Sequence, residues 1–296
     1  MNQAGAVKAE GKVKLIGLSG GRSIVFEGPC LVMAVVNCNN DSFYVPNTTQ
    51  GRGSEAQAVE TALKAMEDGA AIVDFGGEST RPGAEYIEEE EELRRVIPVI
   101  ESFRRYSTLP VSVDTRKAAV ARAAIDAGAD IINDVSALED DPIMLPLCAE
   151  LGVPVILMHK KGKPRDMQKS PEYSDAAVEV KDYLLGRALA AQKGGLPKNK
   201  IMLDPGIGFG KRLEDNLALI NRLAEIRSTD YPVVIALSRK SFIGEITGRD
   251  AGGRLAGTIA ANAAAIMGGA DIIRVHDVKE AVDLTKVLYA IKGAGK

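Results

Sequence analysis

Polar residues that could do chemistry follow short apolar runs at eight places along this chain of 296 residues. Carboxylates, amides, an imidazole and a guanidinium can together bind a polar heterocycle and an anion, provided that they lie close together. Residues that follow the strands of an eight-stranded α/β barrel do lie close together, because the carboxyl ends of all strands open at one mouth. The pattern therefore predicts such a barrel, with its active site at the mouth. The polar residues are Asn37, Asp74, Asp114, Asn133, His159, Asp204, Ser238 and Arg274.

Three of these residues form a set of hydrogen-bond acceptors that is typical of a site for a flat heterocycle. Asp114, Asn133 and Asp204 follow separate runs, and a carboxylate can accept two parallel hydrogen bonds from the amino-pyrimidine edge of a pterin or a guanine. Aspartates are also common helix caps after strands, which is the competing interpretation of Asp114 and Asp204. We favour the heterocycle clamp, because all three residues leave their strands toward one mouth.

A glycine-rich segment follows the sixth run. Gly206, Gly208 and Gly210 alternate with other residues after Asp204, and they predict a backbone that passes close to a ligand in conformations that a β-carbon would forbid. The glycine spacing matches neither the dinucleotide fingerprint nor the P-loop. The competing interpretation is a simple glycine-rich turn with a capping aspartate.

The last two runs are followed by side chains that could hold an anion. Ser238 to Ser241 follow the seventh run and Arg274 to Asp277 the eighth, and the loops at these places often bind phosphate in barrels of this kind. Arg274 and His276 are two residues apart on an extended chain, so they point the same way and could grip a diphosphate. Alternatively, Arg274 pairs with a neighbouring carboxylate and His276 caps the last helix. We favour the anion, since the chain has only two histidines and each comes directly after a predicted strand.

Two further features complete the candidate site. The amide oxygen of Asn37 could help to hold a magnesium ion that bridges diphosphate oxygens. The segment from Glu78 to Gly83 is consistent with a loop that closes over a substrate, in which Thr80 and Arg81 supply a hydroxyl and a guanidinium. An exposed polar turn fits this segment about equally well.

Strands and helices are expected to alternate to the end of the chain, because continuous apolar runs are typical of parallel strands buried on both faces. Pro110, Pro154 and Pro232 each stand at the start of a run, where a missing amide hydrogen is tolerated best. The predicted strands are Leu31 to Val36, Ala71 to Val73, Val111 to Val113, Asp130 to Ile132, Val153 to Met158, Ile201 to Leu203, Val233 to Leu237 and Asp271 to Val275. The predicted helices are Glu55 to Asp68, Glu88 to Arg105, Arg116 to Ala127, Asp141 to Glu150, Tyr173 to Gln192, Leu213 to Ile226, Leu255 to Met267 and Lys279 to Ile291, with left-handed C-terminal caps at Gly69, Gly128 and Gly194.

The N-terminal part predicts a small addition to the barrel. Lys12 to Leu18 and Ser23 to Glu27 flank a glycine-containing turn, so they are expected to form a β-hairpin that covers the floor of the barrel. The length and the 46% hydrophobic composition suit one complete barrel. We therefore expect a single domain over residues 1–296, in which residues 1–28 are an extension and the hairpin.

The composition excludes several classes of protein. A formal net charge of −3 argues against nucleic-acid binding driven by bulk electrostatics. The three cysteines are widely spaced, which indicates neither a disulfide framework nor a zinc site. No apolar run reaches the length of a membrane span and no secretory signal is evident, so we expect a cytoplasmic protein without a membrane partner.

Taken together, these segments resemble dihydropteroate synthase, an enzyme family of the folate pathway. The resemblance covers most of the chain from about Leu31, and such a set of motifs in this order is highly specific. The motifs are Asp74 to Gly83, Ser112 to Lys117, Ile132 to Val135, Met158-His159, Leu203 to Lys211, Ser238 to Gly244 and Arg274 to Val278.

The resemblance implies an activity and a role for each residue that matches a motif. The activity is condensation of (7,8-dihydropterin-6-yl)methyl diphosphate with p-aminobenzoate, with release of diphosphate, Mg²⁺ as cofactor and sulfonamides as mimics of p-aminobenzoate. We expect Asp114, Lys240, Arg274 and His276 to be catalytic. The implied roles are pterin binding for Asp114, Asn133, Asp204 and Lys240, diphosphate binding for Thr80, Arg274 and His276, a p-aminobenzoate pocket for Arg81, Pro82, Phe209 and Ser241, and metal binding for Asn37.

One segment departs from the family pattern. After the first strand the family has a Thr-Pro pair and an Asp-Gly-Gly segment, whereas this chain has Asn39-Asn40 and Val45-Pro46-Asn47. Two alternatives are therefore kept: a pterin-dependent methyltransferase on the same barrel, and a catalytically impaired barrel that binds pterin. A methyltransferase has no diphosphate to hold, so the cationic residues after the last strands argue against the first alternative. Since dimers are the commonest soluble assembly, a homodimer is expected.

Overall fold

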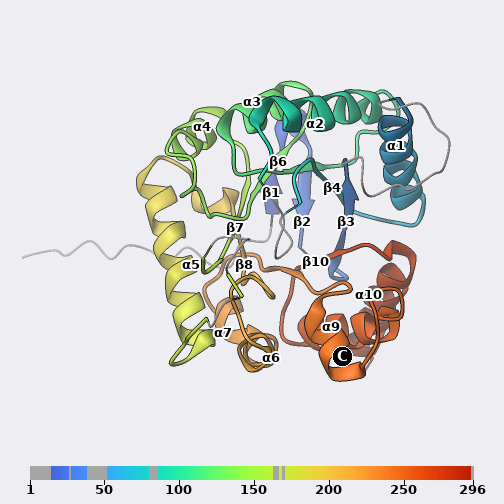
Figure 1. Cartoon of the computed structure of the whole chain (residues 1–296), viewed down its shortest axis with the longest axis vertical. Helices are drawn as coiled ribbons and strands as arrows, with labels where there is room; N and C mark the ends of the chain where they lie inside the picture. The colour runs from blue at the N-terminus through green and yellow to red at the C-terminus, as the bar shows by residue number, and fades with distance from the viewer. Residues whose placement is uncertain are drawn as a thin grey trace, which may run out of the picture.

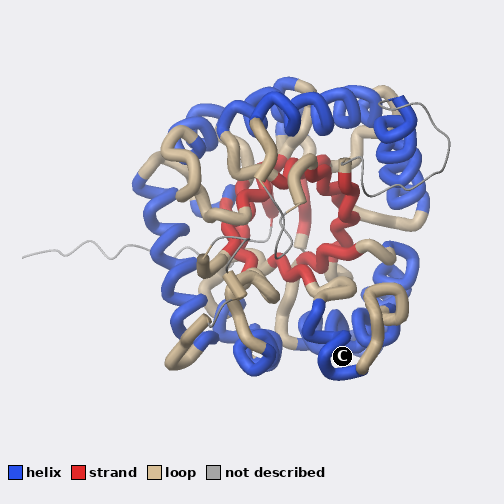
Figure 2. Tube along the Cα trace, in the orientation of Figure 1, coloured by secondary structure: helices blue, strands red, loops and turns tan. Residues whose placement is uncertain are grey.

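Eight parallel strands form a barrel that is surrounded by helices (Figures 1 and 2). The structure is a computed structural model, and it describes residues 15–26, 28–38, 52–79, 86–162, 167–168 and 171–294. The strands pair in the order β8-β7-β6-β5-β4-β3-β10-β9, and a parallel bridge between Leu203 and Val233 joins the two ends of this order. The predicted barrel is therefore confirmed. The strands are β3 (Leu31–Asn37), β4 (Ile72–Gly76), β5 (Val111–Asp114), β6 (Ile131–Asp134), β7 (Val155–Met158), β8 (Ile201–Asp204), β9 (Val234–Ala236) and β10 (Ile272–Val275).

Several strands continue past the end of the apolar run that predicted them. β4 extends from the predicted end at Val73 to Gly76, and β6 extends from Ile132 to Asp134. Polar side chains at the mouth remain within the ladder, because barrel strands stay paired with their neighbours on both sides. The prolines at the strand starts have no amide hydrogen, but their carbonyls take part in the hydrogen bonds between strands. The carbonyl of Pro110 accepts from Val73 N, and that of Pro154 accepts from Ile132 N.

The helices follow the predicted order, with three corrections. The predicted helix from Leu213 to Ile226 is two helices, since Arg222 between them has a non-helical backbone and its guanidinium binds Asp175 and Glu225. Gly194 is not left-handed, because its helix runs to Lys193 and the positive φ falls on Gly195 instead. A short helix, α8, was not predicted. The helices are α1 (Arg52–Glu67), α2 (Glu89–Arg104), α3 (Ala118–Asp126), α4 (Met144–Leu151), α5 (Ala176–Lys193), α6 (Leu213–Asn221), α7 (Leu223–Arg227), α8 (Ser241–Thr247), α9 (Leu255–Met267) and α10 (Val278–Gly293).

The predicted N-terminal hairpin covers the closed end of the barrel. Strands β1 (Leu15–Gly17) and β2 (Ser23–Val25) pair antiparallel. Ile16 and Ile24 pack in one buried cluster with the first residues of the barrel strands, and Asp130, a buried carboxylate at this end, accepts hydrogen bonds from Arg22 and Arg104. Apolar packing and this ion pair close the floor, so a ligand reaches the barrel interior from the mouth. None of the helices in the described part of the chain has both the length and the apolar composition to cross a membrane.

Candidate active site

The centre of the barrel mouth holds one cation between two carboxylates. Arg274 on β10 donates from Nε to Asp74 Oδ2 at 2.6 Å and from Nη2 to Asp114 Oδ2 at 2.8 Å. Asn133 on β6 donates from Nδ2 to the same Asp74 oxygen at 3.2 Å. Asp74 is fully buried, and Asp114 and Asn133 are nearly so. Strands β4, β5, β6 and β10 thus bring these side chains into one cluster.

This cluster has unused acceptors. Asp74 Oδ1 and Asp114 Oδ1 are buried and have no hydrogen-bond partner among the described residues. A buried carboxylate oxygen without a partner is costly unless a ligand or a water supplies the hydrogen bond. Burial raises the pKa of Asp114 to about 7, although the Arg274 guanidinium opposes the shift. The competing interpretation of Asp114 as a helix cap is wrong, because Asp141 accepts from the first amide of α3, that of Ala118.

Asp204 and Lys240 lie beside this cluster. Burial raises the pKa of Asp204 and lowers that of Lys240 to about 8, and each charge opposes the shift of the other. Asp204 Oδ1 accepts from Gly206 N at 2.7 Å, so Asp204 also caps the glycine turn, as its competing interpretation required. Lys240 Nζ donates to the carbonyl of Ile207 and lies 4.9 Å from the centroid of the Phe209 ring. The carboxylate and the ammonium therefore flank the glycine-rich segment.

The glycines adopt the predicted left-handed conformation, and two of them also lie against another part of the main chain. Gly206, Gly208 and Gly210 all have a positive φ, of 65°, 84° and 64°. A β-carbon on Gly206 would lie 1.9 Å from the carbonyl oxygen of His159, and one on Gly210 would lie 2.1 Å from that of Lys161. Only the missing β-carbon of Gly208 faces a site residue, with Lys240 Cδ 3.6 Å away. Gly206 and Gly210 therefore make room for the main chain after β7. The close approach of this backbone to a ligand stays a prediction.

His159 does not join the mouth cluster. Its side chain is buried, its Nδ1 lies 2.8 Å from Lys211 Nζ, and its ring packs edge-on against Tyr183. Burial, helped by the charge of Lys211, lowers the pKa of His159 to about 2. His159 is therefore a buried hydrogen-bond partner of Lys211.

The second histidine lies at the rim. His276 is exposed, and its main-chain N donates to Ser238 Oγ at 3.2 Å while its Nδ1 lies 3.0 Å from the same oxygen. This contact ties the loop after β10 to the loop after β9. The N-cap residue of α10 is Asp277, so His276 is not the helix cap of the competing interpretation. The competing interpretation of Arg274, that it pairs with a carboxylate, is confirmed. Its Nη1, however, takes part in neither of the two bonds.

The remaining predicted residues lie around this mouth or outside the described chain. Asn37 is the half-buried last residue of β3, opposite Gly76 on β4. Phe209 is half-buried on the glycine segment, and Ser241 is the exposed first residue of α8. Thr80, Arg81, Pro82 and the unusual residues 39–47 lie outside the described residues.

The donor set fits magnesium only if the substrate supplies ligands. Within the ranges that the structure describes, no group of three or more His, Cys, Asp or Glu residues could hold a metal ion. Mg²⁺ commonly binds through one or two protein oxygens together with waters and substrate phosphates. The amide oxygen of Asn37 suits that mode of binding and would not hold a metal ion alone.

Two residues of this region were missed or given no role by sequence reasoning. Asp74 was recognised as a strand-end residue but not as a member of the site, although a carboxylate inside the apolar run of β4 is a usable signal. Lys211 directly follows the glycine segment (residues 206–210), and its buried contact with His159 joins residues 52 positions apart. No sequence pattern specifies such a contact.

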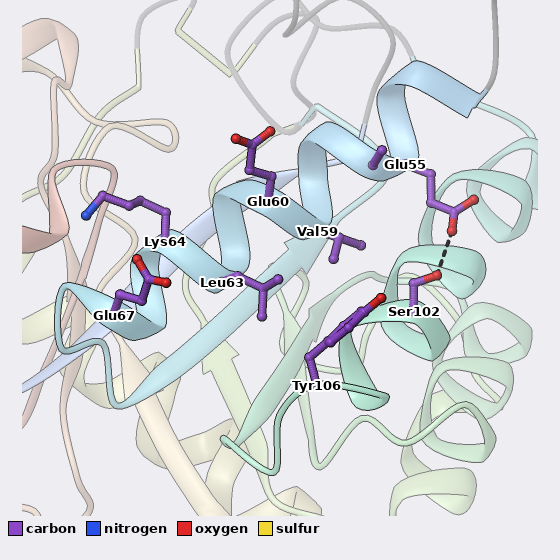
Figure 3. Close-up of a pocket in the computed structure, with 9 residues that line it drawn as sticks. Glu55, Val59, Glu60, Leu63, Lys64, Glu67, Ser102 and Tyr106 are labelled. Carbon is purple, nitrogen blue, oxygen red and sulfur yellow. Dashed lines mark hydrogen bonds between the residues drawn. The ribbon is translucent and has the colours of Figure 1, made fainter.

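A groove of about 760 Å³ lies away from the mouth, on the outside of the barrel between α1 and α2 (Figure 3). Val59, Leu63 and Tyr106 line it, and Ser102 Oγ donates to Glu55 Oε1 at its edge. It contains none of the strand-end residues. The predicted site residues therefore lie at the mouth and not in this groove.

Comparison with known proteins agrees with this geometry. A family model described as pterin binding enzyme matches residues 33–276. Dihydropteroate synthase of Escherichia coli strain K12 is 43% identical over 263 residues, which cover 89% of this chain and 92% of that protein. The structure of Xanthomonas albilineans dihydropteroate synthase with 4-aminobenzoic acid matches with a TM-score of 0.89 and 43% identity, over 95% of this chain and 99% of that one. The structure of the Xanthomonas enzyme with 7,8-dihydropteroate matches with a TM-score of 0.85 and 40% identity, over the same shares.

Proposed function

The chain belongs to the family of pterin binding enzymes, and we propose that the barrel mouth is the site at which it acts as a dihydropteroate synthase. The reaction joins (7,8-dihydropterin-6-yl)methyl diphosphate to p-aminobenzoate and gives 7,8-dihydropteroate and diphosphate. The C–O bond to the diphosphate breaks, the amine nitrogen bonds to the methylene carbon, and the amine loses a proton. The protein is thus a transferase.

The unpartnered carboxylate oxygens inside the barrel carry this proposal. Asp74 Oδ1 and Asp114 Oδ1 are buried acceptors without donors in the described chain, and a pterin edge is rich in N–H donors. Asp114, Asn133, Asp204 and Lys240 bind the pterin in our proposal, with Asp74 as the residue that holds Asn133 and Arg274 in place. A pterin in this position satisfies acceptors that would otherwise remain a cost to the fold.

The charges of the mouth suit the bond that breaks. Departure of the diphosphate leaves positive charge on the pterin methylene, and the buried carboxylates of Asp114 and Asp204 stabilise that charge without reorganising. Arg274 and His276, with Thr80, hold the departing diphosphate; Arg274 Nη1 is the part of the guanidinium outside the carboxylate contacts. Magnesium, when bound through Asn37, supplies further positive charge to the diphosphate oxygens. Mg²⁺ is therefore the cofactor in this proposal.

The p-aminobenzoate lies next to the glycine segment in this proposal. Arg81, Pro82, Phe209 and Ser241 form its pocket, and the Phe209 ring together with the Lys240 ammonium offers an apolar face beside a cation. An aromatic amine with a carboxylate fits that combination. Because the arylamine is a weak base, it is unprotonated near neutral pH and its lone pair is free. It attacks the methylene carbon once departure of the diphosphate leaves positive charge there, and no strong general base is needed.

The experiment that tests the function is diphosphate release from the dihydropterin ester by the purified chain, with and without p-aminobenzoate and Mg²⁺. We expect release that requires both, with an equal amount of dihydropteroate. Pterin binding without release, even at high Mg²⁺, would instead identify the catalytically impaired binder. Methyl transfer from a methylated pterin, without diphosphate release, would identify the methyltransferase.

We further propose that residues 1–296 form one domain, that the protein is a cytoplasmic homodimer, and that it has no membrane or nucleic-acid partner. The shared cluster between the hairpin and the barrel strands supports the single domain, and dimers are the commonest soluble assembly. Light scattering of the purified chain measures the assembly, and a single cooperative unfolding transition, seen alike by two probes, supports one domain.

A further inference from the structure

Lys211 is a buried cation that the chemistry above does not use. It lies directly after the glycine segment, and its side chain is almost fully enclosed. Its Nζ lies 2.8 Å from the Gly206 carbonyl oxygen, 3.1 Å from that of Phe209 and 2.8 Å from Nδ1 of His159. An ammonium has three N–H donors, and a neutral His159 protonated on Nε2 offers a lone pair at Nδ1. All three donors of Lys211 are therefore matched, although burial lowers its pKa well below the ordinary value.

The glycine segment is held at every carbonyl from Gly206 to Gly210. Side chains from several parts of the fold donate to these oxygens, and Gly206 and Gly210 also lie against the main chain after β7. A loop with each successive carbonyl bound in this way is fixed in one conformation, as a site built before the ligand arrives requires. The donors are Lys211 to Gly206 and Phe209, Lys240 to Ile207, Gln168 to Gly208 and Tyr173 to Gly210.

Lys211 has the most central place among these donors. It alone binds two carbonyls of the segment, and it links them to His159 on the neighbouring loop. The segment carries Phe209, and its Ile207 carbonyl anchors Lys240. A shift of the segment would move both groups that we assign to the substrates.

We propose that Lys211 is a positioning residue for the synthase site, whose ammonium, held by His159, fixes the glycine segment so that Phe209 and Lys240 meet the substrates. This inference rests on the proposed function and deepens it. Lys211 itself touches no substrate, because its three donors are spent inside the protein.

Lys211→Met tests the proposal, because it keeps the length and apolar stem of the side chain and removes its donors. We expect KM for p-aminobenzoate and for the pterin ester to rise about tenfold or more, since small misplacements of a site are costly. Amide hydrogen exchange in residues 206–210 should accelerate about tenfold, because the segment opens locally once its hydrogen bonds are lost. Exchange in β8 should not change.

Lys200→Met is the matched control. Lys200 Nζ also donates to a main-chain oxygen, that of Gly17, but at the closed end of the barrel. The control should leave KM and exchange in residues 206–210 unchanged. Equal effects of both substitutions on KM would show that Lys211 acts through general stability and would overturn the proposal.

A folded Lys211→Met protein with unchanged KM and unchanged exchange would also overturn it. If that variant does not fold, Lys211→Gln keeps a donating amide and should give a smaller effect in the same direction; failure of both to fold would reduce Lys211 to a stability residue and reject the proposal. Exchange is measured without substrate. If the parent chain shows no synthase activity, the proposed function fails while exchange still decides whether Lys211 fixes the segment.

Discussion

The guanidinium of Arg274 donates a 2.8 Å hydrogen bond to the carboxylate of Asp114, which links β10 to β5 across the interior of the barrel. The same guanidinium also binds Asp74 on β4. One buried cation thus pairs with two buried carboxylates, so the cluster of Arg274, Asp74 and Asp114 carries a net negative charge when all three are ionised. A ligand that brings N–H donors or developing positive charge is favoured beside these carboxylates, whereas the diphosphate that we assign to Arg274 meets Nη1, outside both carboxylate contacts.

Removal of Arg274 should lower the free energy of unfolding, because two buried carboxylates lose their cation. Arg274→Ala leaves Asp74 and Asp114 buried without their cation, and breaking such a pair typically costs about 3–5 kcal/mol. Urea unfolding at pH 8 and pH 5 measures this loss. We expect a smaller loss at pH 5, because a carboxyl without its cation is protonated more readily in the folded protein. Equal losses at the two pH values would show that packing, and not charge, sets the effect.

The pKa of Asp114 predicts opposite pH trends for stability and for binding. Because burial raises this pKa from 3.8 to about 7, the folded state binds the proton more tightly than the unfolded state does. The contribution of Asp114 to stability therefore rises as the pH falls from about 7 toward 4. Pterin binding, which needs the ionised acceptor, weakens over the same interval. Calorimetry of binding and urea unfolding across this range should show both trends, and Asp114→Asn should remove both.

The barrel and the strand-end positions of most polar residues at the mouth could be predicted from the sequence, because apolar runs that end in a polar residue are a local pattern. The sequence was not sufficient for contacts that join distant loops. The role of Asp74 depends on its contact with Arg274, and that of Lys211 on its contact with His159. Neither contact could be predicted from the sequence. The glycines show the same limit: their positive φ was predictable from their type, but the carbonyl that requires it was not.

The close approach at Gly206 predicts a large effect of one methyl group. Gly206→Ala combines a left-handed backbone with a β-carbon 1.9 Å from the His159 carbonyl oxygen. Gly152→Ala is the control, since Gly152 has a similar φ of 60° and nothing within 4 Å of the added carbon. The control should cost about 1–2 kcal/mol from backbone strain alone, and Gly206→Ala should cost more. Similar unfolding free energies would mean that the loop after β7 yields without penalty.

Lys240 should affect binding far more than stability. Its ammonium lies between Asp204, Phe209 and the Ile207 carbonyl, so Lys240→Ala removes a group that we assign to the substrates and one hydrogen bond to the main chain. The hydrogen bond is worth about 1 kcal/mol, which sets the expected loss in unfolding free energy. Pterin affinity should fall about tenfold or more, since a hydrogen bond from a charged group contributes about 1.5–3 kcal/mol.

The pKa of Lys240 gives a second measure of the same prediction. Burial lowers this pKa to about 8, so the ammonium loses its proton just above that pH. KM of the parent should rise above about pH 8, and that rise should be absent from Lys240→Ala. Lys292→Ala is the control, because Lys292 Nζ also donates to a main-chain carbonyl, that of Ile266 at 3.1 Å, on the outer helices. A Lys240→Ala variant that loses stability but keeps its pterin affinity would confine Lys240 to bracing the glycine segment.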